Sequence, residues 1–342
     1  MLSKLKIMSL LSLPFLAFAA CREKKDSSKV NAVKQEASTK PGIVFLLGGQ
    51  SNMEGYAQVS KEVVGELSSV NNVFVYCAHH SAFDSQSIQW SAGKKPTWKN
   101  LQPCGGFPAT MGPEVSFGLL ASKAFPDKNV YLIKYAKGST SVFCNWQPPS
   151  RTEAYKKYQG DAICKDPEHS NQDPSYLRFE KTVADGIAEI PAAVKWSWGG
   201  MLWVQGEQDA SGGKHPFFAE TYQENLGHLV QTIRAKLQFP QLTFVAAKIK
   251  AGAMTSASGQ GPSPLKLVRD SIHNIAVKDG SFKTFETWDL PSTEGDCWHF
   301  TTESVLTIGA RFAQALGFGK DAGRFPPPKT ATCTQMFTGP AP

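Results

Sequence analysis

The sequence lacks the features that would point to nucleic acid or to a membrane-spanning protein. Net charge is low along most of the chain, because the first 40 residues account for +5 of the formal net charge of +7. The nearly neutral remainder offers no electrostatic footprint for a phosphate backbone. No apolar run reaches the ~20 residues that a membrane-spanning helix needs. We therefore expect neither a nucleic-acid partner nor a transmembrane segment.

Several short motifs are also absent. The sequence has no Cys-x-x-Cys pair, no Gly-Lys-Ser/Thr of a phosphate-binding loop, and no Gly-x-Gly-x-x-Gly of a dinucleotide site. Met53 stands where a Gly-x-Ser-x-Gly elbow needs glycine. These absences argue against the common nucleotide, dinucleotide and zinc-ribbon sites. We expect no cofactor and no resident metal.

The N-terminus has the pattern of a secretory signal peptide. Two lysines precede an apolar run over residues 7–20, which predicts a signal peptide over residues 1–20. Cys21 follows two small residues, as at the processing site of bacterial lipoproteins, although Phe18 stands where such sites usually have leucine. Residues 21–41 are polar and suit a flexible tether. We expect an exported protein of the periplasm or cell envelope, either lipid-anchored at the outer membrane or cell surface, or soluble.

Seven cysteines are present, and setting Cys21 aside leaves an even number. An even number of cysteines in an exported chain indicates disulfides. Sequence does not fix the connectivity, but pairing between neighbours along the chain gives Cys77–Cys104, Cys144–Cys164 and Cys297–Cys333. The third pair would anchor the C-terminal tail to the loop that holds Cys297. The alternative for Cys297 is a buried free thiol.

From residue 42 onward, short β-branched or aromatic runs alternate with stretches whose apolar residues have helical spacing. This alternation is typical of an α/β domain in which helices cover both faces of a parallel sheet. We expect one domain over residues 42–318, followed by a Pro-rich tail over residues 319–342 that crosses the surface as an extended strap. The predicted strands are 43–47, 73–76, 130–135, 201–204 and 242–249, and the predicted helices are 113–125, 174–190, 217–237, 264–277 and 302–316.

A serine on a glycine-rich turn follows the first predicted strand. Residues 48–55 read Gly-Gly-Gln-Ser-Asn-Met-Glu-Gly, and Ser51 stands where the strand ends and a helix begins. A hydroxyl in that position faces the edge at which open α/β sheets bind ligands, and a nearby base would make it a nucleophile. The competing interpretation is that these residues serve only to make the turn.

Two further polar groups stand at the ends of predicted elements. Asp296 precedes His299 by one turn of chain, so its carboxylate can accept from Nδ1–H and leave Nε2 free to take a serine proton. The competing interpretation is a loop acid followed by a residue that caps the last helix. Residues 203–209 follow another strand, which would place Gln205 and Glu207 at the same edge of the sheet as the serine, unless they form a solvated loop.

Together these blocks resemble the carbohydrate acetylesterase and sialate O-acetylesterase branch of the SGNH hydrolase superfamily. The resemblance extends from Gly42 to about Gly317. It implies a three-layer α/β/α sandwich with a flavodoxin-like parallel sheet, and a serine esterase that removes O-acetyl groups from carbohydrates. It rests on Gly-Gln-Ser-Asn-Met-Glu-Gly at 49–55, Gly-Pro-Glu at 112–114, Lys-Gly-Ser-Thr at 137–140, Trp-Val-Gln-Gly-Glu-Gln-Asp at 203–209 and Asp-Cys-Trp-His at 296–299.

The resemblance implies a Ser-His-Asp triad. Ser51 would attack the acetyl ester, His299 would act as general base and then as general acid, and Asp296 would orient His299. Glu207 is the alternative triad acid, or a residue that supports the triad or contacts the substrate.

The resemblance also implies an oxyanion hole, the set of donors that stabilises negative charge on the ester oxygen. Its donors would be the side-chain amide of Gln205, the backbone N–H of Ser51 and the N–H of a glycine. Gly112 is the first candidate for that glycine and Gly138 the second.

The expected partner is an acetylated oligo- or polysaccharide. Acetylated xylan, another acetylated glycan and O-acetylated sialic acid all fit an exported esterase. Trp90, Trp98 and Trp146 lie in two long segments without clear periodicity, 78–111 and 143–173, and would either stack on sugar rings or form loop core. We expect a monomer.

Two other functions stay open. A non-catalytic glycan-binding lipoprotein would be favoured only if Ser51 or His299 were missing, and both are present. A metal-dependent hydrolase lacks the support of a His-x-x-x-His or Glu-x-x-His spacing. Its candidate ligands are His79, His80, Asp84, His215, Glu207 and Asp209.

Overall fold

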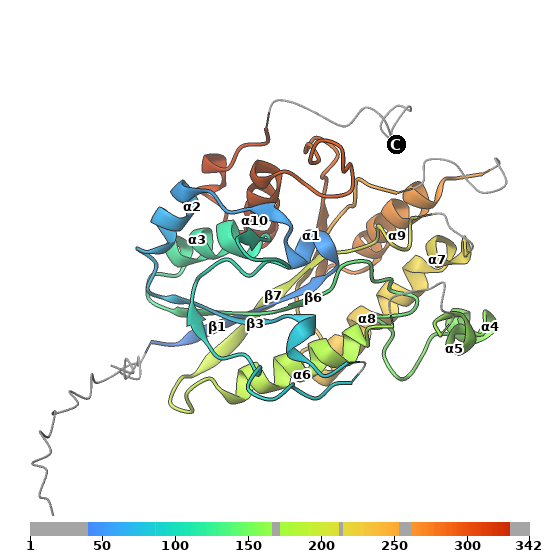
Figure 1. Ribbon diagram of the computed structural model, residues 1–342, viewed down its shortest axis with the longest axis horizontal. Coiled ribbons are helices and arrows are strands. Elements are labelled where there is room, and N and C mark those ends of the chain that lie inside the picture. The colour runs from blue at the N-terminus through green and yellow to red at the C-terminus, as the bar shows by residue number, and fades with distance from the viewer. Residues whose placement is uncertain (1–39, 86, 166–171, 212–214, 253–260, 329–342) are drawn as a thin grey trace, which may run out of the picture. The chain divides into compact units, whose positions relative to one another are not determined.

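A twisted sheet with helices on both faces forms the described part of the chain (Figure 1). The computed structural model describes residues 40–328 except 86, 166–171, 212–214 and 253–260. The predicted signal peptide, Cys21, nearly all of the tether and the end of the tail lie outside the described residues. Among the described helices, none has the length and apolar character needed to cross a membrane.

The main sheet has seven strands, six of which are parallel. They are β1 (Gly42–Gly49), β3 (Val73–Ala78), β4 (Lys99–Asn100), β6 (Asn129–Ala136), β7 (Trp196–Val204), β8 (Phe244–Ala247) and β9 (Phe282–Phe285). Their order is β4-β3-β6-β1-β7-β8-β9, and β4 alone runs antiparallel to its neighbour. A separate antiparallel pair is formed by β2 (Ala57–Gln58) and β5 (Thr110–Met111). The predicted parallel α/β sheet is confirmed, whereas β9 and the three two-residue strands were not predicted.

β1 lies between β6 and β7 near the middle of the sheet. In flavodoxin the first strand adjoins the second and third strands. Here β1 adjoins the third and fourth parallel strands, because the chain visits β3 and β6 on one side before it crosses to β7, β8 and β9 on the other. Connections therefore diverge at the carboxyl end of β1, which is where open α/β sheets bind ligands.

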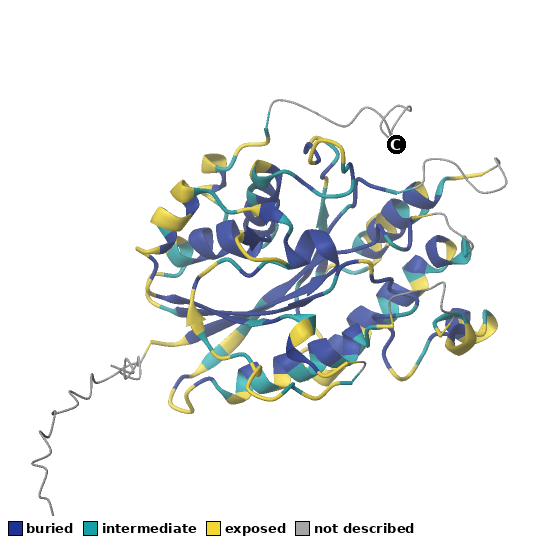
Figure 2. Ribbon diagram, in the orientation of Figure 1, coloured by how far each residue is buried: buried dark blue, intermediate teal, exposed yellow. Residues whose placement is uncertain are grey.

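Successive side chains of β1 enter two hydrophobic cores. Val44 and Leu46 belong to one core, and Ile43, Phe45 and Leu47 belong to the other. The first core lies under α6 (Ser175–Ala188), α8 (Tyr222–Lys236) and α9 (Pro264–Lys278), and the second lies under α2 (Lys61–Leu67), α3 (Glu114–Ala124) and α10 (Thr302–Ala315). Figure 2 shows the consequence, a buried sheet and helices that expose only their outer faces.

The shorter helices lie mainly in the connections. They are α1 (Ser51–Glu54), α4 (Glu153–Lys157), α5 (Gly160–Ile163), α7 (Phe217–Glu220), and the 3₁₀ turns η1 (His80–Ala82) and η2 (Ala322–Arg324). The predicted helix over residues 217–237 is divided at Thr221 into α7 and α8. Thr301 caps α10 by accepting from the backbone N–H of Ser304, which fixes where that helix begins.

Two of the three predicted disulfides are present. Cys77 pairs with Cys104, and Cys144 pairs with Cys164. Each bridge has at least one cysteine in one of the two long segments without clear periodicity, 78–111 and 143–173. The predicted partner of Cys297, Cys333, lies outside the described residues, so the third bridge stays a prediction.

The described start of the tail packs on the domain. Ala322 is buried, and the hydroxyl of Thr307 in α10 donates to the carbonyl of Pro326 at 3.1 Å. The expected extended strap is thus interrupted by the turn η2, whose Arg324 pairs with Glu66 of α2.

Candidate active site

Ser51 is held at the carboxyl end of β1 by a turn that only glycine permits. Gly49 has φ +147°, and a Cβ on it would lie 2.1 Å from the carbonyl oxygen of Val204 in β7. The next backbone N–H, that of Gln50, donates to the same carbonyl at 2.9 Å. Ser51 then begins α1, so its own N–H has no partner within the helix.

A cavity of about 300 Å³ opens beside Ser51. The residues around it come from the ends of β1, β6 and β7 and from the loop before α10. The structure therefore brings together Ser51, Glu207 and His299, as sequence predicted from strand ends and spacing. The cavity is lined by Gln50, Ser51, Ser139, Glu207, Gln208, Ser211, Trp298 and His299.

His299 is oriented by a carboxylate and by an aromatic ring. Its Nδ1 lies 2.6 Å from Oδ2 of Asp296, and because a carboxylate only accepts, Nδ1 carries the proton and Nε2 keeps its lone pair. Tyr56 stacks on the imidazole, with ring centroids 4.5 Å apart and planes 4° from parallel. Burial, with the charges of Glu54 and Asp296, raises the pKa of Tyr56 to about 12, so the stacked ring stays neutral. Tyr56 was not among the predicted site residues.

Glu207 contacts a different partner. Its Oε1 accepts from the amide nitrogen of Asn52 at 2.6 Å, and burial raises the pKa of this carboxyl. The same Asn52 amide donates to the carbonyl of Trp298 at 3.0 Å, and its Oδ1 accepts from the N–H of Phe300 at 3.2 Å. Asn52 thus fixes the backbone on both sides of His299. Sequence analysis gave Asn52 no role, although it directly follows Ser51.

The structure argues against the predicted oxyanion role of Gln205. Its side-chain nitrogen donates to Oδ2 of Asp209 at 2.5 Å and to the carbonyl of Thr140 at 2.9 Å, which uses both amide hydrogens. Its Oε1 accepts from the hydroxyl of Tyr222 at 3.0 Å. Gln205 is fully buried and does not line the cavity. It ties three segments together behind the site instead.

The two predicted glycine donors are also engaged. The N–H of Gly112 donates to Oε1 of Glu114 at 3.0 Å, and the N–H of Gly138 donates to Oε2 of Glu54 at 2.6 Å. Both acceptors are buried carboxylates, and Glu114 is further paired with Lys134 at 2.6 Å. Neither N–H is available to a substrate oxygen in this arrangement, so both predictions need correction.

Gln50 supplies the donor that the sequence interpretation missed. Its Oε1 accepts from the backbone N–H groups of Gly206 and Gln208 at 3.3 and 3.2 Å, which identifies that atom as oxygen. The Nε2 group of the same amide donates to no acceptor within the described residues. Because Gln50 lines the cavity next to Ser51, its N–H₂ group is a candidate donor to an incoming oxygen.

Of the two interpretations of Trp90, Trp98 and Trp146, sugar stacking or loop core, the structure supports loop core. Trp146 is fully buried, and the indole N–H groups of Trp90 and Trp98 donate to Asp185 and to the carbonyl of Gly186 in α6. The aromatic residue that borders the cavity is Trp298. Nearby, the ring of Phe107, 58% exposed, meets Tyr56 edge to face at 5.0 Å.

The candidate metal ligands do not gather at the cavity. Asp84 accepts from the hydroxyl of Ser91, and Asp209 accepts from two backbone N–H groups as well as from Gln205. Only His79 and His80 come together, and they do so around Glu54, which sequence analysis had not considered.

Comparisons with known proteins agree with this geometry. The mostly parallel sheet flanked by helices is an α/β fold of the SGNH-like type. The chain belongs to the family described as carbohydrate esterase, sialic acid-specific acetylesterase, whose sequence model matches residues 41–317. It is therefore a carboxylic ester hydrolase.

Individual relatives are distant. A probable carbohydrate esterase of Arabidopsis thaliana is 26% identical over 297 residues, covering 80% of this chain and 90% of the relative. The 1.6 Å structure of an Arabidopsis thaliana protein has a TM-score of 0.50 at 20% identity and covers 81% of this chain and 99% of that one. A carbohydrate acetylesterase from Xanthomonas citri has a TM-score of 0.53 at 16% identity, and the match covers 80% of this chain and 56% of that one. NanS has a TM-score of 0.52 at 10% identity, and the match covers 81% of this chain and 97% of that one. These likenesses show the fold.

Proposed function

We propose that this esterase removes O-acetyl groups from a carbohydrate with Ser51 as nucleophile. The observation that supports the proposal is the cavity shared by Ser51 and His299, with Asp296 accepting from Nδ1 of His299 at 2.6 Å. Nε2 of His299 takes the proton as Oγ bonds to the carbonyl carbon. The intermediate then collapses, its bond to the sugar oxygen breaks, and that oxygen takes the proton from Nε2.

The second half of the reaction releases acetate. Water attacks the acetyl-serine, gives one proton to Nε2 of His299, and the bond from the acetyl carbon to Oγ breaks as Oγ takes that proton back. Asp296 favours both steps because its charge stabilises the imidazolium that forms each time. The free enzyme is thereby restored with one water consumed.

We assign the oxyanion donors to the N–H of Ser51 and the side-chain amide of Gln50. The N–H of Ser51 is unsatisfied at the start of α1, and the amide of Gln50 is held by its oxygen on the backbone of residues 206 and 208. An amide whose oxygen is already held in place does not have to reorient when negative charge develops on the ester oxygen. Donors of this kind therefore lower the energy barrier of the reaction.

The substrate is proposed to be an acetylated oligo- or polysaccharide. Membership of the carbohydrate esterase family supports this class. Trp298 in the cavity wall and the exposed ring of Phe107 beside Tyr56 offer apolar faces of the kind that sugars stack upon. Acetylated xylan and O-acetylated sialic acid are the two substrates to compare first.

Export is proposed as well. The two disulfides support it, because such bridges persist in oxidising compartments. Intact-mass analysis of the protein recovered from its native envelope should show that the first 20 residues are removed. A lipid adduct on Cys21 would mark the anchored form, and retention of the whole N-terminus would contradict export through this segment.

The experiment that tests the function is acetate release from acetylated xylan and O-acetylated sialic acid. Ser51→Ala should lower kcat by at least about 10⁴-fold, because removing the nucleophile leaves only binding and the oxyanion donors. Ser211→Ala is the matched control, since Ser211 also lines the cavity but is exposed and has no assigned role. Equal activity of Ser51→Ala and wild type would refute the proposal.

A further inference from the structure

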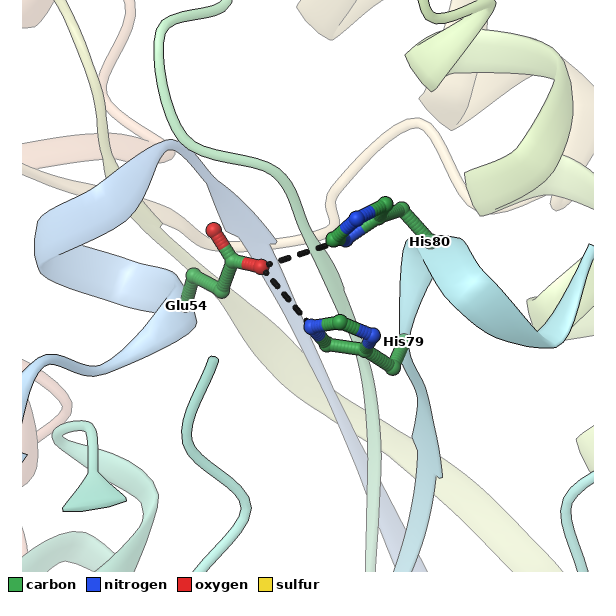
Figure 3. A group of neighbouring side chains, drawn as sticks. All are labelled: Glu54, His79 and His80. Atoms are coloured by element: carbon green, nitrogen blue, oxygen red, sulfur yellow. Dashed lines mark ion pairs between the residues drawn. The ribbon is translucent and has the colours of Figure 1, made fainter. Parts of the chain in front are cut away.

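Two histidines and a glutamate converge at the C-terminal end of α1, one helical turn after Ser51 (Figure 3). His79 and His80 follow β3, and Glu54 is the last residue of α1. Oε1 of Glu54 lies 3.3 Å from Nε2 of His79 and 3.5 Å from Nδ1 of His80. All three donor atoms lie within 4.8 Å of one another.

The two histidine nitrogens lie close to Glu54 but make no hydrogen bond within the described residues. Nε2 of His79 and Nδ1 of His80 are both buried, and neither has a hydrogen-bond partner among the described residues. The Glu54 side chain is 5% exposed, so its charge is held away from solvent.

The spacing suits a metal ion better than direct hydrogen bonds. Bonds of ~2.0–2.1 Å from a tetrahedral Zn²⁺ place its donor atoms ~3.4 Å apart. The two observed distances, 3.3 and 3.5 Å, bracket that value. We propose that Glu54, His79 and His80 bind a divalent transition-metal ion of the Zn²⁺ type, with the partly exposed histidine side leaving a fourth position for water.

Neighbouring groups orient two of the three proposed ligands, His79 and Glu54. Oγ of Ser81 lies 2.8 Å from Nδ1 of His79 and can accept its proton, which leaves Nε2 for the metal. The other oxygen of Glu54 accepts from the N–H of Gly138 at 2.6 Å. The carboxylate would therefore bridge the ion and the loop of residues 137–140, whose Ser139 lines the cavity.

The competing state is a metal-free one. In it, Nδ1 of His79 accepts from the N–H of Ser81 at 3.3 Å, and Nε2 directs its proton toward Glu54. The two states differ in whether Nε2 offers a lone pair or a proton, so a measurement of bound metal separates them. Nothing in this site requires the esterase activity of Ser51, and the two proposals can fail independently.

The test is isothermal titration of Zn²⁺ into the full chain, prepared without a polyhistidine tag and freed of metal by a chelator. Wild type should take up one ion per chain, and His79→Ala, His80→Ala and Glu54→Gln should each weaken binding at least about tenfold. His273→Ala, which removes an exposed histidine on α9, should bind like wild type.

Thermal unfolding gives a second readout that does not depend on activity. Zn²⁺ should raise the Tm of wild type and of His273→Ala, and should leave the Tm of His80→Ala unchanged, because an ion that binds only the folded state stabilises it. Mg²⁺ should have no such effect, since it prefers oxygen ligands. Absence of Zn²⁺ binding to wild type, equal binding to His80→Ala, or equal binding of Mg²⁺ would overturn the proposal.

Discussion

The two ends of α1 carry the same kinds of side chain in opposite arrangements. At the Ser51 end, His299 has its own carboxylate three residues earlier, and that carboxylate occupies Nδ1 while Nε2 keeps its lone pair beside the cavity. At the Glu54 end, His79 and His80 direct their buried nitrogens at one shared carboxylate. A carboxylate that accepts from Nδ1 of an imidazole leaves Nε2 free to take a proton. A carboxylate that lies beside the free nitrogens of two imidazoles can instead bind a metal ion together with them.

The buried carboxylates around the site also differ in the direction in which their pKa values are shifted. Burial raises the pKa of Asp209 to about 7, because hydrogen bonds from Gln205, Val142 and Phe143 do not compensate for lost hydration. At Glu54 burial also opposes the charge, but interactions with His79 and His80, the N–H of Gly138 and the charge of Lys137 outweigh it, and the pKa falls to about 2. The number and kind of groups that face a buried carboxylate thus set the direction of its pKa shift.

The largest expected effect contrasts the histidines directly. His299→Ala should lower kcat for acetate release by about 10⁶-fold, because nucleophile and base act as one unit. His80→Ala should change kcat by no more than about tenfold, since His80 reaches the site only through Glu54 and the loop of residues 137–140. Steady-state kinetics on one acetylated substrate, with circular dichroism to verify folding, measures both. Comparable losses in the two variants would show that the two regions are one functional unit.

The next effect separates the two acids near His299. Asp296→Asn should lower kcat by about 10⁴-fold, because an amide in place of the carboxylate favours the wrong tautomer. Glu207→Gln should cost no more than about 10²-fold, since Glu207 acts through Asn52. Both are measured as kcat at saturating substrate. If Glu207→Gln proves the more damaging change, Glu207 is the triad acid.

The smallest effect compares the two glutamines. Gln50→Ala should lower kcat by about 10²–10³-fold with little change in KM, as expected when an oxyanion donor is removed. Gln205→Ala should instead lower the Tm, because it removes buried hydrogen bonds from the side-chain amide to Asp209, to the carbonyl of Thr140 and from Tyr222. A pure KM effect in Gln50→Ala would mean that this amide binds sugar rather than the oxyanion.

The positions in the site that sequence and structure give alike depend on local rules. Ser51 follows from a glycine-rich turn at the end of a strand, and the contact between Asp296 and His299 follows from a spacing of one turn. The parallel sheet could also be predicted from local patterns, because most of its strands appear in the sequence as short apolar runs between helical stretches. β9 escaped prediction because only two of its four residues are aromatic and one is an exposed lysine.

The donors that were wrongly assigned depend on long-range contacts instead. Whether the amide of Gln205 faces a cavity or a buried carboxylate depends on Asp209, Thr140 and Tyr222, which come from three other positions in the chain. Spacing also gave no indication of the group around Glu54, because its histidines stand beyond β2 and α2 in sequence and come together only through the turn after β3. The direction of a side chain is a property of its packed neighbours, and one sequence does not specify it.

One contact described above also bears on how the protein is made. The hydrogen bond from Phe300 to Asn52 joins residues 248 positions apart, and it holds the histidine loop against the helix that begins with the nucleophile. A chain that emerges from the ribosome in order completes this bond only when almost all of it has been synthesised. The part of the chain that carries His299 therefore joins α1 late in synthesis, so we expect the nascent polypeptide to stay inactive until then.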